Sequence, residues 1–591
     1  MENITTPTPS TNLLTKTAKD PKVSPALQMD IITITWNDQK WFPNYLDSLI
    51  KQKNVSLKNI NLVVVDNNSR EENFQVLLDC REKAEAALGS FTIMRQSENL
   101  GFARACNVGA FATRGDLVFF LNIDTELEEK ALYHFYEAMN RDDDSWGAWE
   151  FRQFPYEHPK IYNPVTGEIS WASGAALMVK RSIFDSIGGF DTNFYMYTDD
   201  VDISWRIRLE GYKIKYLPKC IVYHYSYQSF NDVKPLQYYY SIINNLQLRF
   251  KFGTWAEIRE GVKMVRGIFD HQGPFENSRK KLIKLLLTSS YKAWVQRRWF
   301  MRNKKKIEKY SPHKFVGFDY EERRMGDFIY NEKPNETPLV SVIVRTVNRP
   351  DILRETLISL RNQTYNQIEV IVVEDGPRGS GDLLEKEFGD LRIRYYCTHQ
   401  KVGRTKAGNL GLELATGQYL CFLDDDDLLY ADHFEVLIRQ LERNPSYKII
   451  HNFAFEAPTK TISKSPYKYT FKSLNTIHQK RFNAIRLCQY NYLPIQTVLF
   501  HRDVYKSLGG FDEEMDMLED WNLWMKYASK FDFYTVFKTC SIYKVPADKK
   551  IQMSRQMQLD DALQDARRRQ EAFPIQFSPA RLVESLKNIS I

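Results

Sequence analysis

The sequence has few cysteines, no long apolar run and few apolar residues near residue 1. Its seven cysteines are scattered without a C-x-x-C pair, which argues against a disulfide framework and a zinc site. No stretch reaches the roughly 18 consecutive apolar residues that favour a transmembrane helix. Residues 1–29 are rich in Thr, Ser, Pro and Lys and contain no apolar leader segment. We therefore expect a disordered tail at 1–29 and a cytoplasmic protein.

The chain repeats itself at a spacing of roughly 300 residues, which indicates a duplicated domain and not a solenoid. The tetrapeptide Gly-Gly-Phe-Asp occurs at 188–191 and again at 509–512. An acidic pair follows each copy, at 199–200 and at 519–520, and a tryptophan follows each pair. A chain of 591 residues is also too long for one hydrophobic core. The sequence therefore predicts two related domains.

Apolar segments in both halves end in carboxylates. Residues 419–423 run directly into four consecutive aspartates at 424–427, and residues 117–121 lead to Asp124. Such runs are typical of buried strands, and ligands of open α/β sheets bind at the carboxyl ends of the strands. Four adjacent like charges favour a bound cation, and oxygen ligands suit Mg²⁺ or Mn²⁺ carrying a diphosphate. The alternative is a solvated acidic turn or a helix N-cap.

The start of each half has a strand, helix, strand pattern. In the first half, residues 30–37 and 61–65 read as strands around a helical stretch, and Asp66 follows the second strand. This βαβ pattern predicts a largely parallel sheet. Asp66 could accept a hydrogen bond from the N3–H of a pyrimidine base, whereas the alternative is an Asx-turn.

Several motifs resemble glycosyltransferase family two. They are residues 98–109, the Asn-Ile-Asp at 122–124, the Trp-Ala-Ser-Gly-Ala at 171–175 and residues 188–206. Residues 30–235 are most similar to its rhamnosyltransferase group, and residues 338–550 to the family in general. The resemblance implies two α/β modules of the GT-A fold, each with a Rossmann-like, mostly parallel sheet. Each would bind a nucleotide sugar and invert the anomeric centre.

The resemblance also implies roles for ten residues. The nucleotide would contact Thr35 and Asp66 in the first module and Thr346 and Asp375 in the second. The metal ligands would be Asp124 and His224 in the first, and Asp424 and Asp426 in the second. The general bases, which take the proton of the acceptor hydroxyl, would be Asp200 and Asp520.

Each module departs from the family pattern once. Asn122 stands where a second carboxylate is expected in the first module, so His224 or nearby Lys and Arg would have to meet the diphosphate charge. The alternative for His224 is a structural or surface histidine. The second module has no histidine after its last core strand, and Lys544 or Lys549 could neutralise the diphosphate instead.

The remaining segments are basic and helical in pattern. Residues 236–337 predict a basic, aromatic helical bridge between modules at 30–235 and 338–555, and residues 556–591 predict a charged helical tail. Residues 279–309 mix Lys and Arg with Leu and Trp, as a helix lying on an anionic membrane does. A linker helix with a solvated basic face is the alternative. We expect no nucleic-acid partner, because no recognition module accompanies the short basic run.

These features lead to one main hypothesis. The protein would be a bifunctional, metal-assisted glycosyltransferase that uses Mg²⁺ or Mn²⁺, with the stronger case for a metal in the second module. It would transfer sugars from nucleotide-sugar donors, which for the first module would be dTDP-rhamnose. The acceptor would be a glycan or a lipid-linked glycan at the inner face of the membrane, and the product a surface polysaccharide such as an O-antigen or a capsule. The alternatives are one active module beside a sugar-binding or scaffolding relic, a nucleotidyltransferase, and a lectin-like binding protein without turnover.

Overall fold

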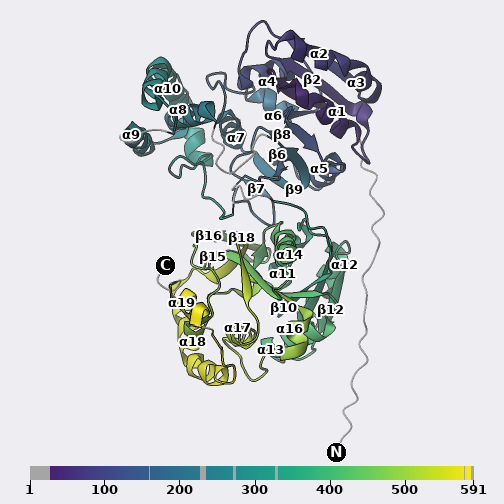
Figure 1. The fold of residues 1–591 in the computed structure, drawn as a ribbon, viewed down its shortest axis with the longest axis vertical. Coiled ribbons are helices and arrows are strands. Elements are labelled where there is room, and N and C mark those ends of the chain that lie inside the picture. Colours follow the sequence, from purple (N-terminus) through teal and green to yellow (C-terminus); the bar gives the residue numbers. More distant parts are fainter. Residues whose placement is uncertain are drawn as a thin grey trace, which may run out of the picture. The chain divides into compact units, whose positions relative to one another are not determined.

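The computed structural model describes residues 27–158, 160–225, 234–269, 274–326, 331–577 and 579–587. Most of the tail predicted at 1–29 lies outside these residues. The chain divides into two compact units, one ending at Asn331 and the other beginning at Glu332 (Figure 1). Each unit contains a mixed sheet flanked by helices.

The sheet of the first unit runs in the order β3-β2-β1-β4-β8-β6-β9-β5, with β7 paired to β9. Its strands are β1 (Met29–Thr35), β2 (Ile60–Asp66), β3 (Ser90–Arg95), β4 (Leu117–Leu121), β5 (Thr125–Leu127), β6 (Trp146–Phe154), β7 (Glu168–Ile169), β8 (Ala176–Lys180) and β9 (Lys213–His224). Strands β3, β2, β1 and β4 are parallel, whereas β8 pairs antiparallel with both β4 and β6. The carboxyl ends of β1, β2 and β4 therefore meet at one edge of the sheet.

The helices of the first unit precede or follow these strands. They are α1 (Phe42–Ile50), α2 (Glu71–Asp79), α3 (Arg81–Ala87), α4 (Phe102–Phe111), α5 (Ala131–Met139), α6 (Arg181–Ser186), α7 (Asp199–Leu209), α8 (Pro235–Phe252), α9 (Trp255–Phe269) and α10 (Ser278–Tyr310), with short 3₁₀ turns at Gln39–Trp41 and Leu57–Asn59. In the predicted bridge at 236–337, α8, α9 and α10 make up most of the described residues up to Tyr310, and the first unit extends to Asn331. Leu248 and Phe252 of α8 and Phe300 of α10 pack with Trp205 of α7 in one buried cluster.

The second unit repeats the topology of the first, in the order β12-β11-β10-β13-β17-β15-β18-β14, with β16 paired to β15. Its strands are β10 (Val340–Thr346), β11 (Ile368–Glu374), β12 (Ile393–Cys397), β13 (Tyr419–Asp424), β14 (Leu428–Leu429), β15 (Ile449–Lys464), β16 (Tyr467–Phe471), β17 (Val498–His501) and β18 (Phe533–Pro546). Its helices are α11 (Pro350–Arg361), α12 (Gly381–Glu387), α13 (Arg404–Leu414), α14 (His433–Arg443), α15 (Ala484–Gln489), α16 (Arg502–Leu508), α17 (Glu519–Ala528), α18 (Lys549–Gln570) and α19 (Pro579–Lys587), with a 3₁₀ turn at Ile495–Thr497. The prediction of two α/β modules with mostly parallel strands is confirmed.

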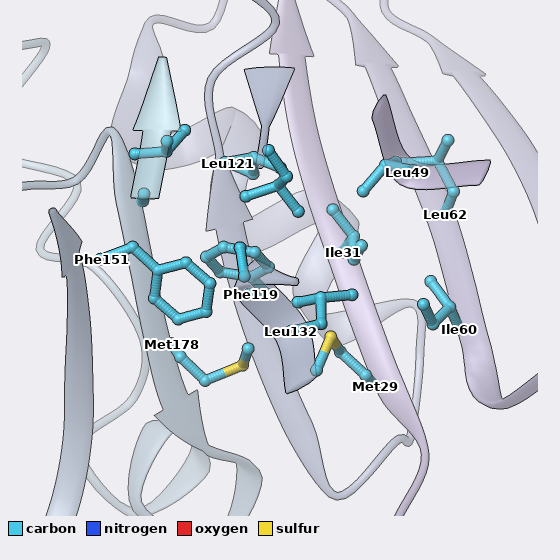
Figure 2. Packing of buried hydrophobic residues seen from close by; sticks show 14 of the residues in the cluster. Met29, Ile31, Leu49, Ile60, Leu62, Phe119, Leu121, Leu132, Phe151 and Met178 are labelled. Carbon is cyan, nitrogen blue, oxygen red and sulfur yellow. The ribbon is translucent and has the colours of Figure 1, made fainter. Parts of the chain in front are cut away.

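Alternate residues of the parallel strands form the core. Side chains of a strand point to opposite faces in turn, so residues two apart share a face. Figure 2 shows Met29 and Ile31 of β1, Leu62 of β2 and Phe119 of β4 in one such layer. Leu49 of α1 packs in the same layer. This apolar layer fixes the register of β1, β2 and β4, and therefore which residues stand together where the three strands end.

None of the helices in the described part of the chain combines the length and the apolar character that a membrane crossing requires.

Candidate functional site

The ends of β1 and β2 bring Thr35 and Asp66 side by side in the first module. Asp66 is fully buried and accepts hydrogen bonds from Gln39 Nε2 at 3.1 Å and from Ser69 N at 3.3 Å. Its carboxylate therefore organises the loops that follow the two strands. Asn67, which the sequence analysis missed, comes next, and its N–H donates to the carbonyl of Thr35 at 2.9 Å.

Two buried side-chain oxygens at this edge of the sheet form no hydrogen bond within the described part of the chain. Among the described residues, neither Thr35 Oγ1 nor Asn67 Oδ1 has a hydrogen-bond partner, although both atoms are buried. A buried polar atom without a partner costs free energy, so such atoms mark places where a bound molecule would supply the missing bond.

The second module has the same register with different residues. Thr346 pairs with Glu374 at the ends of β10 and β11. Glu374 accepts hydrogen bonds from the N–H groups of Gly379 and Ser380, both at 2.9 Å. Glu374 therefore occupies the position of Asp66 in the strand register, and both buried carboxylates accept hydrogen bonds from the loop that follows their strand.

Asp375 is in turn the counterpart of Asn67. Its N–H donates to the carbonyl of Thr346 at 2.8 Å. Its carboxylate accepts from Val402 N at 2.6 Å and Gly403 N at 3.1 Å. Comparing Val-Asp-Asn at 65–67 with Val-Glu-Asp at 373–375 would have given this correspondence from the sequence.

The acidic tip of the first module lies against a histidine. Pairing of β5 with β9 places Thr125 opposite His224, and His224 Nε2 lies 3.4 Å from Asp124 Oδ1. His224 Nδ1 lies 2.8 Å from Gln153 Oε1. If Nδ1 donates its hydrogen to Gln153, the other ring nitrogen, Nε2, carries a lone pair directed toward Asp124. Metal-binding histidines have this arrangement, with one nitrogen donating to a neighbour and the other facing the metal.

A further carboxylate, the exposed Asp38, lies close enough to Asp124 for the two charges to interact. Burial and the neighbouring charge of Asp124 raise the pKa of Asp38. Asp38 lies in the loop after β1, and Asn122 holds the position of the expected second carboxylate. The sequence analysis missed Asp38, because no motif connects it with Asp124.

The four aspartates at the end of β13, Asp424 to Asp427, alternate in direction. Asp425 is buried and bonds to Thr346 Oγ1 at 2.6 Å and Arg349 Nε at 3.0 Å. Asp427 is buried and accepts from Lys544 N at 2.9 Å. The side chains of Asp424 and Asp426 are 34% and 39% exposed. The two inner aspartates hold the strand tip in place, and the two predicted metal ligands lie at the surface of the site.

Asp424 and Asp426 fit a hard cation that carries a diphosphate. Although burial opposes it, the pKa of Asp424 is lowered, because Arg345 Nη2 lies 2.7 Å from its carboxylate and Arg404 and Arg349 add positive charge. No group of three or more His, Cys, Asp or Glu side chains in the described residues is arranged to hold a metal ion. Such an ion would take its other ligands from the diphosphate and water, as Mg²⁺ commonly does.

Arg555 supplies a cation near the acidic tip of the second module. Arg555 Nη2 donates to Tyr543 Oη at 2.7 Å. The interaction with Tyr543, and after it the charges of Asp426 and Asp427, raise the pKa of Arg555 although burial opposes this. Lys544, which was expected to neutralise the diphosphate, is buried and pairs with Glu355 at 3.2 Å. Arg555 belongs to α18, the helix that begins at Lys549, and the sequence analysis did not single out Arg555.

A cavity of about 470 Å³ opens beside Arg555. It is lined by Arg404, Met517, Lys550, Ile551, Ser554, Arg555 and Gln558. Arg404 also lies 3.7 Å from Glu519, the residue before the predicted base. The cavity is therefore cationic and adjoins the carboxylates of the site.

The two predicted bases occupy the same place in their modules. Asp200 and Asp520 lie in the first turns of α7 and α17, each after a residue with positive φ, Thr198 at 62° and Leu518 at 60°. Such backbone strain in a non-glycine residue is typical of functional sites. Asp200 accepts from Gly174 N at 3.1 Å and Val201 N at 2.9 Å.

The environment of both bases makes them more basic than a free aspartate. Burial raises the pKa of Asp200. Burial, followed by the charge of Glu519, raises the pKa of Asp520 to about 7. Asp520 accepts from Trp521 N at 2.7 Å and from Asn491 Nδ2 at 2.9 Å. A carboxylate with a pKa near neutral is suited to general-base work.

Residues 30–198 and 341–509 each match the family model of glycosyl transferase family 2. The chain belongs to this family. The two matches begin at the first strand of each module and together cover more than half of the chain. The resemblance expected from the sequence is thereby confirmed for both halves.

Curated relatives in family 2 align with one part of the chain. An uncharacterized glycosyltransferase of Rickettsia typhi is 28% identical over 34% of this chain and 61% of its own length. One of Haemophilus influenzae is 30% identical over 29% of this chain and 65% of its own length. The chain thus spans less than two thirds of either relative. A solved mannosyltransferase of Pyrobaculum calidifontis, in complex with GDP-mannose and Mn²⁺, is 17% identical with a TM-score of 0.31, covering 50% of this chain and 79% of that one.

Proposed function

We propose that the chain is a bifunctional inverting glycosyltransferase, with one nucleotide-sugar reaction in each module. One observation carries the proposal for both. In each unit a carboxylate of raised pKa, Asp200 or Asp520, lies in the first turn of a helix. The charge of Asp424 acts on Asp520. Asp200 accepts from Gly174 N, and the next residue, Ala175, accepts from the N–H of Asn122 in the Asn-Ile-Asp motif. A binding protein without turnover would have no need of such a base in both copies.

The proposed reaction is a single displacement at the anomeric carbon. The acceptor hydroxyl oxygen forms a bond to that carbon as the bond to the diphosphate oxygen breaks, so the configuration inverts. Asp200 or Asp520 takes the proton of the acceptor hydroxyl. A bound Mg²⁺ or Mn²⁺ would neutralise charge on the departing diphosphate, held by Asp124 and His224 in the first module and by Asp424 and Asp426 in the second.

Each module would bind the nucleotide at the edge where its first two strands end. Thr35 and Asn67 face this edge in the first module with buried oxygens, and Asp66 holds the surrounding loops. In the second module Thr346 and Asp375 take these places, with Glu374 as the loop organiser. Because Asn67 can donate and accept while Asp375 only accepts, the modules would prefer different bases or different contacts to one base.

The proposed product is a surface polysaccharide such as an O-antigen or a capsule. The rhamnosyltransferase-like motifs of the first module support dTDP-rhamnose as its donor, and the presence of two modules supports the addition of two sugars to one growing chain. The acceptor would be a glycan or a lipid-linked glycan. The cationic cavity beside Arg555 supports an acceptor with a negative charge in the second module.

The test measures nucleoside diphosphate released by the full chain from a panel of dTDP-, UDP- and GDP-sugars with Mn²⁺ or Mg²⁺. Asp200→Asn and Asp520→Asn are measured beside it. If two donors react, and each substitution abolishes the turnover of a different one, the result supports two independent transferases. If one substitution leaves turnover of every donor unchanged, that module is a relic. If no donor reacts even with lipid-linked acceptors present, the proposal fails and a sugar-binding protein takes its place.

A further inference from the structure

The longest helix of the first unit, α10, has apolar residues on two opposite faces. Its inner face packs on α8, where Leu282 and Phe300 are buried. Figure 1 shows α8, α9 and α10 grouped together in this unit. Packing of the inner face therefore attaches α10 to the fold. It does not explain why the outer face also carries large apolar side chains.

The outer face of α10 is a stripe of exposed large apolar side chains. Leu287 is 71% exposed and Trp294 is 61% exposed. The members of the stripe are Ile283, Leu287, Tyr291, Trp294 and Met301. Spacings of four, four, three and seven residues keep all five on one side of a helix. A soluble protein rarely leaves such a contiguous apolar surface without a partner.

Basic residues surround this apolar stripe. Helix α10 contains twelve Lys and Arg and a single Glu. The residues on or beside the stripe are Lys280, Lys284, Arg298, Arg302 and Lys305, all of them exposed. The Arg298 guanidinium lies 4.6 Å from the centre of the Trp294 ring. The face is thus apolar in its middle and strongly positive along its length.

The neighbouring helix extends the same surface. Trp255, at the start of α9, is exposed, and the Arg297 guanidinium of α10 lies 4.4 Å from the centre of its ring. Trp255 therefore stands next to α10. Tryptophan and tyrosine are the side chains that favour the boundary between lipid headgroups and acyl chains.

We infer that the outer face of α10, with Trp255 of α9, binds the surface of an anionic lipid bilayer. The apolar stripe enters the headgroup region, and the lysines and arginines contact lipid phosphates. Charge complementarity decides between the possible occupants. A second copy of this face would bring two strongly positive helices together, whereas an anionic membrane neutralises them. This contact would hold the enzyme beside a lipid-linked acceptor, although it does not depend on the proposed reaction.

The experiment is co-sedimentation of the full chain with vesicles, without any sugar donor. Vesicles of phosphatidylcholine with phosphatidylglycerol are compared with pure phosphatidylcholine, at low and at high salt. We expect binding to the anionic vesicles that weakens at high salt. The combined variant Lys280→Gln, Lys284→Gln, Lys305→Gln should lose about fivefold in affinity for each lysine. The variant Leu287→Ser, Trp294→Ser should lose about tenfold for each side chain.

The matched control is Met553→Ser with Met557→Ser, because these methionines of α18 are exposed to the same degree as Met301. This control should bind as the unchanged chain does. Unfolding midpoints should stay equal in all variants, since the substituted side chains are exposed. Equal binding by the stripe variants and the control, or no binding to anionic vesicles, overturns the inference. A lipid-free dimer that Leu287→Ser with Trp294→Ser dissociates would also overturn it and make the face a subunit interface.

Discussion

The two modules share one sheet topology but neutralise charge at the strand tip in different ways. In the first module a single aspartate, Asp124, faces His224. In the second module β13 ends in Asp424 and three more aspartates follow, and Arg345 and Arg349 form ion pairs with members of this group. Pairing of β5 with β9 puts His224 beside the first tip. At the second tip the corresponding strand carries Tyr543, which is bonded to Arg555. The fold therefore specifies where the charge lies but not which groups balance it.

The largest expected effect concerns the acidic tips. Asp426→Asn should lower turnover by the second module about 10²–10³-fold, because it removes one of two exposed carboxylates that suit the metal. Turnover by the first module should not change, and this serves as the internal control. Release of nucleoside diphosphate, measured for each donor against metal concentration, tests this. A loss that excess Mn²⁺ cannot partly restore would contradict the role in metal binding.

A smaller effect is expected at the positions that face the tips. His224→Ala should cost the first module about 10–100-fold in metal affinity or turnover. Gln153→Leu should reproduce part of that loss, because Gln153 Oε1 lies 2.8 Å from His224 Nδ1. Titration of turnover with Mn²⁺ measures both. Tyr543→Phe is the matched change in the second module. An equal loss of turnover in the second module would show that Tyr543 and His224 have the same role, and it would contradict the difference between the two acidic strand ends.

Matched glycines before α4 and α13 separate backbone strain from crowding. Gly101 has φ 77° and Gly403 has φ 98°, both in a region that L-residues avoid. A Cβ on Gly101 would lie 2.6 Å from Tyr195, whereas one on Gly403 would lie 3.8 Å from Asp516. Gly403→Ala should cost about 1–3 kcal/mol of unfolding free energy, and Gly101→Ala more. Denaturant unfolding of both variants measures the difference, and equal losses would show that crowding adds nothing.

The smallest expected effect is on stability at the two bases. The pKa of Asp520 rises from 3.8 to about 7 on folding, so the folded state binds more protons and its stability falls as pH rises through this window. Asp520→Asn should therefore stabilise the second module by ~1–2 kcal/mol at about pH 8, and by less as pH falls toward about 4. One donor to Asp520 is the side-chain amide of Asn491, which can turn its oxygen toward the new amide at the cost of the 3.1 Å bond that this oxygen accepts from Leu493 N.

Asp200→Asn should not give this gain. Both donors to Asp200 are backbone N–H groups, of Gly174 and Val201, and an amide nitrogen would face one of them without a bond. Thermal unfolding of both variants across pH tests the pair of expectations. Stabilisation of both variants, or of neither, would contradict it. Turnover of each module should fall as pH drops below the pKa of its base, because only the ionised carboxylate accepts the proton.

Some parts of the site were open to prediction because their signals are local. The apolar runs before Asp124 and Asp424 specify buried strands with acidic ends, and the acidic pairs after the Gly-Gly-Phe-Asp repeats specify the starts of α7 and α17. The role of His224 was implied by the family resemblance, and the structure places this residue at the end of β9. Asp66 and Asp375, for which the resemblance implied the same kind of nucleotide contact, do not share a register position, since the pairing of β10 with β11 places Glu374 at the Asp66 position.

The sequence by itself determined the duplication, the α/β class and the acidic character of the strand tips, because each depends on neighbouring residues in the chain. Only the tertiary structure decided which aspartates point into the site, since Asp425 and Asp427 are turned inward by Thr346, Arg349 and Lys544 from distant segments. It also decided that Arg555 reaches Tyr543, and that α10 packs with one face and exposes the other. Contacts between residues far apart in the chain leave no local pattern, and for that reason the sequence could not show them.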